Sequence, residues 1–185
     1  TQRITNIVRS LVGFARTDSH VASSSYEAVN LKSTIDEAVS LLQLSGSKDY
    51  QFDNFCSAEI TVRGNAQRLM QVFVNLLSNA RDASPIDSQI MIEAHQNGSF
   101  IHIEIEDFGT GLPEGTIRDN LFEPFVTTKE TGKGTGLGLA LVHGIIGEHG
   151  GKIQLMDKAD YDQGRGVIVQ ISLPAWVNDE EEIVA

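Results

Sequence analysis

Residues 132–139 combine glycines with the start of an apolar pattern in a way that suits phosphate binding. Glycine occupies every second position from 132 to 138, and the segment continues into an apolar pattern with helical spacing. Because glycine has no Cβ, the backbone can turn freely there and approach a ligand closely. A helix that begins beside such a turn presents unpaired N–H groups and the positive end of its dipole, which attract anions. The segment therefore predicts a phosphate cradle.

The same segment excludes two common nucleotide-binding loops. A Walker loop needs Ser or Thr after its Gly-Lys pair, but Lys133 is followed by Gly134. A dinucleotide-binding or protein-kinase loop needs G-x-G-x-x-G, whereas the spacing from Gly132 onward is G-x-G-x-G-x-G. Arg118, Lys129 and Lys133 flank the glycines and could supply positive charge to a nucleotide.

Two amide side chains share one face of a predicted helix. Asn75 and Asn79 are four residues apart, and Gln71 and Asp82 extend the same stripe. Asn offers a carbonyl oxygen to a hard cation and an NH₂ group to an anion. Mg²⁺ takes few protein ligands when it binds together with substrate phosphates. The stripe is either a solvated helix face or a site for a metal and phosphates.

A carboxylate followed by glycines ends another predicted element, the strand over residues 100–106. Asp107 begins a D-x-G-x-G sequence that continues through Gly109 and Gly111. Its carboxylate could accept a hydrogen bond from an exocyclic amine such as that of adenine. The alternative is a turn that the Asp side chain initiates.

Phe122 and Phe125 lie in an otherwise polar loop. Large apolar side chains are unfavourable in such a loop unless they pack against something. They form either a small satellite core or a hydrophobic latch for a mobile lid.

The elements that must position these residues follow from the hydrophobic periodicity. The long helix at residues 65–83 places Leu69, Val72, Phe73, Leu76, Leu77 and Ala80 on one face. The dipeptide Asn97-Gly98 predicts a tight hairpin between two strands, and residues 107–135 show no period and read as a long binding loop. The remaining pattern predicts helices over 1–16, 33–44 and 136–148, and strands over 50–54, 59–62, 89–95, 100–106, 152–156 and 166–173. This mixed order predicts an α/β sandwich with one mixed sheet.

The composition bounds the possible functions. The 185 residues suit one sizeable domain with an appendage, and the net charge of −11 argues against nucleic-acid binding. The single cysteine, Cys56, excludes an internal disulfide and fits a reducing compartment. No apolar run approaches the roughly 20 residues of a membrane span, so no membrane contact is expected from this chain. We interpret the chain as a piece of a longer protein, whose anchor, if it has one, would lie upstream.

The predicted domain organisation has a short helix, a linker, a main domain and a tail. Residues 1–16 form the helix, and the Ser-rich residues 17–29 form the linker, with a boundary near residue 28. The main domain covers residues 30–174, and residues 175–185 form an acidic tail.

The four motifs, taken in order, resemble the N, G1, F and G2 boxes of the sensor histidine kinase catalytic domain. The N box matches Asn75–Asn79, the G1 box Asp107–Gly111, the F box Phe122–Phe125 and the G2 box residues 132–139. That family shares a superfamily with DNA gyrase, the mismatch-repair ATPases and a heat-shock chaperone. The resemblance implies a two-layer α/β sandwich with a mixed sheet, the Bergerat-type ATP-binding fold, preceded by part of a helical dimerisation hairpin.

The resemblance also implies roles for individual residues. Asn79 would coordinate Mg²⁺, Asn75 would support the phosphates of ATP, and Asp107 would bind the adenine amine in a pocket that Gly109 and Gly111 shape. With Asn75 and Asn79, Lys129 would complete the catalytic group. The other implied nucleotide contacts are Thr127, Thr128, Lys133, Gly134, Thr135, Gly136, Leu137, Gly138 and Leu139.

The implied activity is transfer of the γ-phosphoryl group of Mg-ATP to a histidine on the hairpin. Residues 1–16 resemble the end of the second hairpin helix, and the first helix is absent from this chain. None of the five histidines, His20, His95, His102, His143 and His149, has a phosphoacceptor context. The implied partners are the hairpin, a response-regulator receiver domain and a second copy of the full-length protein, in the cytoplasm.

Two alternatives remain, and one departure from the family pattern needs explanation. In ATP-hydrolysing members of the superfamily a glutamate stands four residues before the magnesium Asn, but here that residue is Asn75. This disfavours an ATPase switch and predicts very slow intrinsic hydrolysis. The other alternative is a nucleotide-binding regulatory module without transfer activity. The departure is Asp82, because this position is often basic in the family.

Overall fold

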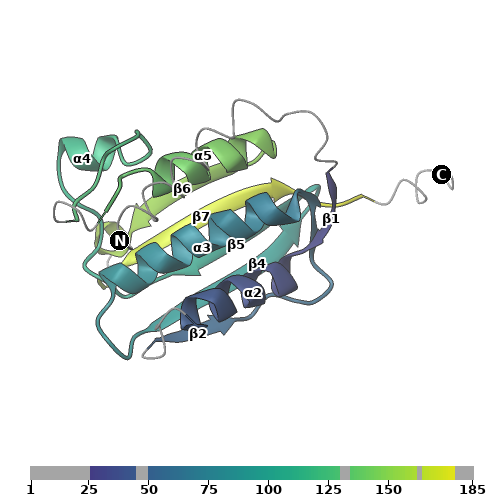
Figure 1. The fold of residues 1–185 in the computed structure, drawn as a ribbon, viewed down its shortest axis with the longest axis horizontal. Helices are drawn as coiled ribbons and strands as arrows, with labels where there is room; N and C mark the ends of the chain where they lie inside the picture. The colour runs from purple at the N-terminus through teal and green to yellow at the C-terminus, as the bar shows by residue number, and fades with distance from the viewer. Residues whose placement is uncertain (1–25, 45–49, 130–133, 162–163, 178–185) are drawn as a thin grey trace, which may run out of the picture.

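The fold has two layers, a mixed β-sheet and three helices that pack on one face of it (Figure 1). The helices are α2 (Leu31–Leu44), α3 (Ala66–Ala83) and α5 (Gly138–Glu148). The α/β fold class predicted from the sequence is confirmed. The chain is represented by a computed structural model that describes residues 26–44, 50–129, 134–161 and 164–177. The helix predicted over residues 1–16 lies outside the described residues.

The sheet has the strand order β2-β4-β5-β7-β6. Only β2 and β4 run parallel to each other, and the other neighbours are antiparallel. Asn97 pairs with Phe100 around the turn at Gly98, as the tight-hairpin prediction required. The strands are β2 (Gln51–Asn54), β4 (Gln89–Asn97), β5 (Phe100–Glu106), β6 (Lys152–Asp157) and β7 (Val167–Pro174).

The core lies between the sheet and the helices. In β5, Ile101, Ile103 and Ile105 point inward and alternate with half-exposed polar residues, which is the period of a strand with one buried face. All six apolar positions predicted for the long helix are buried in α3. Asn65 caps this helix by accepting a hydrogen bond from the backbone N–H of Arg68.

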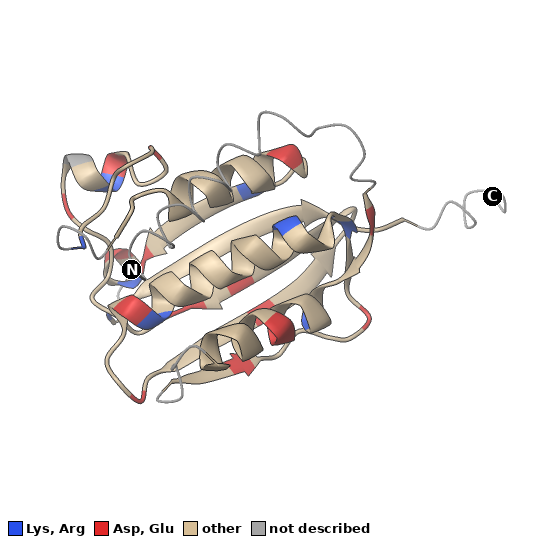
Figure 2. Ribbon diagram, viewed as in Figure 1, with Lys and Arg blue, Asp and Glu red and all other residues tan. Residues whose placement is uncertain are grey.

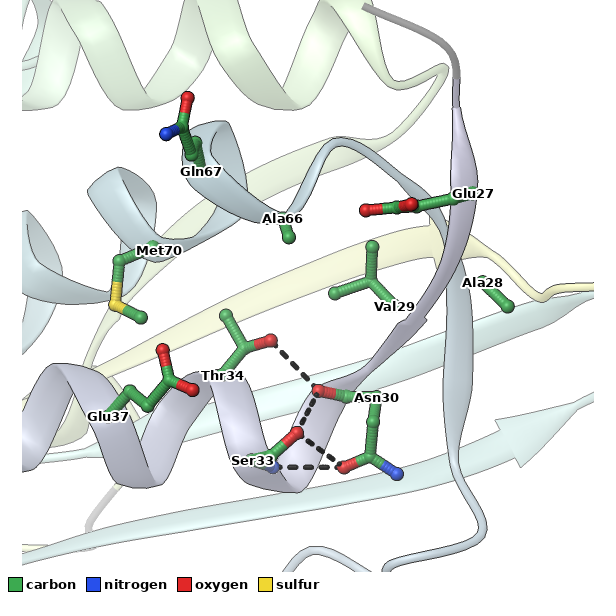
Figure 3. A pocket seen from close by; sticks show the side chains of 10 residues that line it. All are labelled: Glu27, Ala28, Val29, Asn30, Ser33, Thr34, Glu37, Ala66, Gln67 and Met70. Carbon is green, nitrogen blue, oxygen red and sulfur yellow. Dashed lines mark hydrogen bonds between the residues drawn. The ribbon is translucent and has the colours of Figure 1, made fainter.

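The linker predicted for residues 17–29 overlaps a strand, because Glu27–Asn30 form β1. This strand pairs antiparallel with β3 (Thr61–Gly64) in a separate two-stranded sheet. Its partner is distant in the chain, and four residues are too few to show a strand period. Helix α2 begins at Leu31 rather than near Ser33, since the Asn30 side chain accepts a hydrogen bond from the Ser33 N–H (Figure 3).

The first residues of the predicted acidic tail, 175–185, contact the small sheet. Ala175 bridges to Val62, and the Trp176 N–H donates to the Thr61 carbonyl. Residues 178–185 lie outside the described residues. The small sheet therefore brings together the first described strand, β1, and the residues that follow β7, because both pair with β3.

Two short helices lie in segments for which the hydrophobic periodicity predicted neither a helix nor a strand. Helix α4 (Thr116–Asp119) lies within the predicted loop 107–135, and the 3₁₀ helix η1 (Lys158–Tyr161) follows β6. Among the described residues, no helix is both long and apolar enough to cross a membrane. Asp and Glu outnumber Lys and Arg, 25 to 14, and both kinds are spread over the helices and strands (Figure 2).

Candidate nucleotide-binding site

Three of the sequence motifs meet along the second half of α3. A Cβ on Gly109 would lie 2.6 Å from the Ala83 carbonyl oxygen, so the loop after β5 touches the last turn of α3. A Cβ on Gly138, the first residue of α5, would lie 3.2 Å from Oδ1 of Asn75. Figure 1 shows α4 and the start of α5 at the end of the molecule where α3 finishes.

Asp107 is buried at the end of β5 with one carboxylate oxygen left open. Oδ1 accepts hydrogen bonds from the backbone N–H groups of Gly109 at 2.9 Å and Val167 at 3.1 Å. Within the described part of the chain, no hydrogen bond reaches Oδ2. An oriented carboxylate with one open oxygen can accept a hydrogen bond from a ligand amine.

Burial raises the pKa of Asp107 above its ordinary value, while the two backbone N–H donors and the nearby Lys158 oppose that rise. Gly166 permits this close packing: it has φ 127°, and a Cβ there would lie 2.0 Å from the Asp107 carbonyl oxygen. The Asp107 side chain is therefore held by its own loop, through Gly109, and by the start of β7, through Val167.

Asp157 supports the second glycine of the D-x-G-x-G loop from behind. Its Oδ2 accepts a hydrogen bond from the Leu112 N–H at 2.7 Å, and its Oδ1 accepts one from the Ala159 N–H at 3.0 Å. Gly111 has φ 86°, and a Cβ there would lie 2.9 Å from Oδ2 of Asp157. Only glycine fits this position without displacing the carboxylate.

Lys158 is a buried cation next to the same loop, with 3% of its surface exposed. Its ammonium donates to Oε1 of Glu106 at 2.6 Å and lies 3.6 Å from the centre of the Phe108 ring. Asp157 and Lys158 were not identified from the sequence. The only signal for them was a polar pair at the end of a predicted strand, and their contacts are with residues about 50 positions away in the chain.

The amide stripe of α3 faces the glycine segment. The Asn75 amide donates to the Gln71 carbonyl oxygen at 2.8 Å, which leaves Oδ1 directed toward Gly138. Oδ1 of Asn79 lies 3.5 Å from the ammonium of Lys129. Both amides are half-buried.

Asp82 lies between two cations at the end of this stripe. Its Oδ2 accepts from the Lys129 ammonium at 2.6 Å, and its Oδ1 accepts from Nη2 of Arg81 at 2.6 Å and from Nε at 2.9 Å. Burial alone would raise the pKa of Asp82, but the hydrogen bonds from Lys129 and Arg81 outweigh it and lower the pKa. Asp82 is thus an ionised carboxylate within a group that carries net positive charge.

The glycine segment packs closely on the loop that carries the two phenylalanines. Gly136 has φ 66°, and its carbonyl accepts a hydrogen bond from the Phe125 N–H at 2.9 Å. The Phe122 ring packs 5.0 Å from the His143 ring, as a satellite core would, whereas Phe125 is 71% exposed. The two residues therefore differ in burial.

The start of α5 is available to an anion. The N-cap residue Leu137 makes no side-chain hydrogen bond to the helix, and residues 134–136 before it are half-exposed. Gly134 lies against Thr127, because a Cβ on Gly134 would lie 2.7 Å from the Thr127 hydroxyl oxygen. Thr128 is exposed, Thr135 accepts from the Leu137 N–H, and Leu139 packs against the core. Lys133 lies outside the described residues.

A separate hollow of about 340 Å³ lies at the opposite end of α3 (Figure 3). It is bordered by β1, the start of α2 and the first turn of α3, where Ala66 and Gln67 lie far along the helix from Asn79. It contains none of the residues of the four motifs. We place the candidate site by the convergence of the motifs and not by this hollow.

Comparison with known proteins gives matches along most of the chain. Residues 64–177 match the family model described as histidine kinase-, DNA gyrase B- and HSP90-like ATPase. The sensor kinase CckA of Brucella abortus (strain 2308) is 32% identical, over 96% of this chain and 20% of its own length. The sensor histidine kinase ZraS of Escherichia coli (strain K12) is 31% identical, over 97% of this chain and 37% of its own. The chain thus spans well under half the length of these relatives.

A solved structure has the same fold. The mycobacterial sensor histidine kinase MprB superposes with a TM-score of 0.71 at 25% identity, covering 81% of this chain and 97% of that one. These comparisons confirm the resemblance that was drawn from the four motifs.

Proposed function

Because the chain belongs to the family of histidine kinase-, DNA gyrase B- and HSP90-like ATPases and carries the catalytic ATP-binding domain of a histidine kinase, we propose that it transfers the γ-phosphoryl group of Mg-ATP to a histidine. The observation that carries this proposal is the convergence of Asp107, the Asn75–Asn79 amides and the start of α5 along the second half of α3. These groups suit the purine, the metal with its phosphates, and the phosphate chain, respectively.

The purine is assigned to Asp107. Its open Oδ2 accepts a hydrogen bond from the exocyclic amine of adenine, while Gly109 and Gly111 allow the loop to approach the base closely. Guanine has a carbonyl at the corresponding position, and its oxygen could not donate a hydrogen bond to the carboxylate. The site therefore favours adenine.

The phosphates and the magnesium ion are assigned to α3 and the glycine segment. Oδ1 of Asn79 and Oδ2 of Asp82 both lie near the Lys129 ammonium. Oxygen atoms of the kind that bind a hard cation are therefore grouped here. Asn79 would hold the ion, and Asn75, the start of α5 and Lys129 would hold the phosphates. The ion would offset negative charge that develops on the transferred group.

The transfer needs alignment more than a general base. A neutral imidazole attacks phosphorus with its own lone pair; the new N–P bond forms as the bond from phosphorus to the oxygen of ADP breaks. Hydrolysis by water needs a proton acceptor, and Asn75 cannot accept a proton where the ATP-hydrolysing relatives have a glutamate. This disfavours an ATPase switch as the main activity.

The partners follow from the same proposal. The acceptor histidine lies on a helical hairpin, the phosphoryl group passes to a response-regulator receiver domain, and the full-length protein acts as a homodimer. A nucleotide-binding regulatory module without transfer activity is the alternative, and the intact set of site residues argues against it.

Reconstitution tests the proposal. The chain is mixed with Mg-ATP and the separate hairpin domain of the parent protein, and acid-labile phosphate on the hairpin is measured. Transfer is expected from the natural chain and should be abolished by Asn79→Ala. Phosphate-free hairpin, with nucleotide bound to the chain, would favour the regulatory module.

A further inference from the structure

Lys129 reaches across the candidate site from the loop before the glycine segment to the end of α3. Its ammonium lies 2.6 Å from Oδ2 of Asp82 and 3.5 Å from Oδ1 of Asn79. The lysine and the aspartate are 47 residues apart in the chain, so the ion pair joins two separate elements. Its backbone N–H also donates to the Thr127 hydroxyl at 3.1 Å, which orients the start of the side chain.

The charge around Asp82 differs from what its residue type suggests. A lone carboxylate beside bound phosphates would repel them. Here one oxygen of Asp82 is held by Arg81 and the other by Lys129, so two cations surround one anion. The three residues together carry a formal charge of about +1 near neutral pH, since Arg and Lys remain protonated there.

We propose that Asp82 is a positioning residue that holds the Lys129 ammonium beside Asn79, so that Lys129 faces the phosphates of the nucleotide. The cation beside Asn79 is thus supplied by the loop before the glycine segment and not by α3 itself. This inference rests on the proposed function, because it requires a nucleotide whose phosphates lie near Asn79.

The contact differs from an ordinary surface ion pair in its surroundings. Lys129 and Asp82 are 35% and 33% exposed, and the Asn79 amide oxygen lies next to the same ammonium. At the other end of α3, Arg68 and Glu148 form an ion pair at the same 2.6 Å, but it lies away from the glycine segment. That pair joins α3 to the end of α5 and provides a matched control.

Titration calorimetry of Mg-ATP, with adenosine as a competitor, tests the proposal on Asp82→Asn, Lys129→Gln and the double variant. Each single change should weaken Mg-ATP binding about 3- to 10-fold, as expected for partly exposed charge contacts, with adenosine binding unchanged. The double variant should be no weaker than Lys129→Gln alone, because Asp82 acts through Lys129. Glu148→Gln should bind as the natural chain does.

The sign of the Asp82→Asn effect decides between the two accounts of this residue. If Asp82 only adds negative charge, neutralising it tightens Mg-ATP binding, and that result overturns the proposal. Additive losses in the double variant, or equal losses for adenosine, overturn it as well. Failure of the natural chain to bind any nucleotide would instead remove the proposed function, so the two failures are distinguishable.

Discussion

The backbone N–H of Leu112 donates to Oδ2 of Asp157 at 2.7 Å, so a side chain at the end of β6 fixes the loop that follows β5. The same carboxylate lies against Gly111, which has φ 86°. Asp157 is buried, and both of its carboxylate oxygens accept hydrogen bonds from backbone N–H groups, those of Leu112 and Ala159.

Replacing Asp157 with alanine should weaken nucleotide binding although the residue is not placed at the ligand. The change leaves the Leu112 N–H without its partner and frees the loop that follows Asp107. We expect a loss of roughly 5- to 20-fold in affinity for ADP, from the cost of an unpaired, partly buried donor. Calorimetry measures it, with Asp36→Asn, in an exposed pair with Lys32, as the control. Equal affinities in all three proteins would argue against a supporting role.

Replacing Lys158 with methionine should lower the free energy of unfolding. Methionine keeps the aliphatic packing but leaves Glu106 without its partner and removes the cation from the Phe108 ring. Because Lys158 is buried and Glu106 is half-exposed, we expect a loss of about 1–3 kcal/mol in urea denaturation. Lys32→Met breaks an exposed pair with Asp36 and should lower the free energy of unfolding by only a few tenths of a kcal/mol. Equal losses for the two variants would contradict the prediction.

Gly136 and Gly144 should respond in opposite ways to alanine. Gly136 has φ 66°, and a Cβ there would lie 2.4 Å from the backbone of Phe125, whereas a Cβ on Gly144 in α5 meets nothing within 4 Å. Gly136→Ala should weaken Mg-ATP binding about tenfold, because the strained backbone costs about 1–2 kcal/mol. Gly144→Ala should stabilise the fold by about 0.5–1 kcal/mol and leave binding intact. Calorimetry and thermal unfolding measure both, and unchanged binding by Gly136→Ala would be the contrary result.

The protonation of His149 should make stability depend on pH. Its Nδ1 donates to the Ile145 carbonyl at 2.7 Å, so Nε2 is the acceptor for the Asn65 N–H at 3.0 Å and the ring is neutral. Burial lowers the pKa of His149 below its ordinary 6.5, while the Ile145 carbonyl and Glu148 act against that shift and Arg68 adds to it. The unfolded chain therefore binds the proton more readily than the folded one. The stabilisation is complete above pH 6.5 and is lost as the pH falls through the folded pKa.

Denaturation at pH 7 and at pH 5 checks this prediction. The natural chain should lose unfolding free energy at the lower pH, and His149→Gln should lose less. His95→Gln, on the exposed face of β4, should keep the full dependence. If the His149→Gln variant had the same pH dependence as the natural chain, the loss of stability at pH 5 could not be assigned to His149.

The long helix and the site motifs could be predicted because their signals are local. The 3.6-residue spacing identified the buried face of α3 completely, and alternation in residues 100–106 identified β5 with the correct bounds. Strand β1 was missed because its stability comes from pairing with β3, about 35 residues away, and not from its own sequence.

The supporting residues of the site were not predictable for a similar reason. The contacts of Asp157 and Lys158 with the D-x-G-x-G loop join β6 to β5, which are not even neighbours in the sheet. The pairing of Lys129 with Asp82 also depends on how the loop folds back on α3. A sequence motif identifies the residues that face a ligand, whereas the residues behind them are set by tertiary packing.

The most direct test is titration calorimetry of Mg-ATP into the folded chain and into its Asp107→Asn variant. Asparagine can keep the two backbone hydrogen bonds at Oδ1, but it can turn an NH₂ group toward the adenine amine in place of the open oxygen. The natural chain should bind Mg-ATP, and the variant should bind at least about tenfold more weakly. Absence of binding by the folded natural chain, or equal binding by both proteins, would contradict the assignment of this site to ATP.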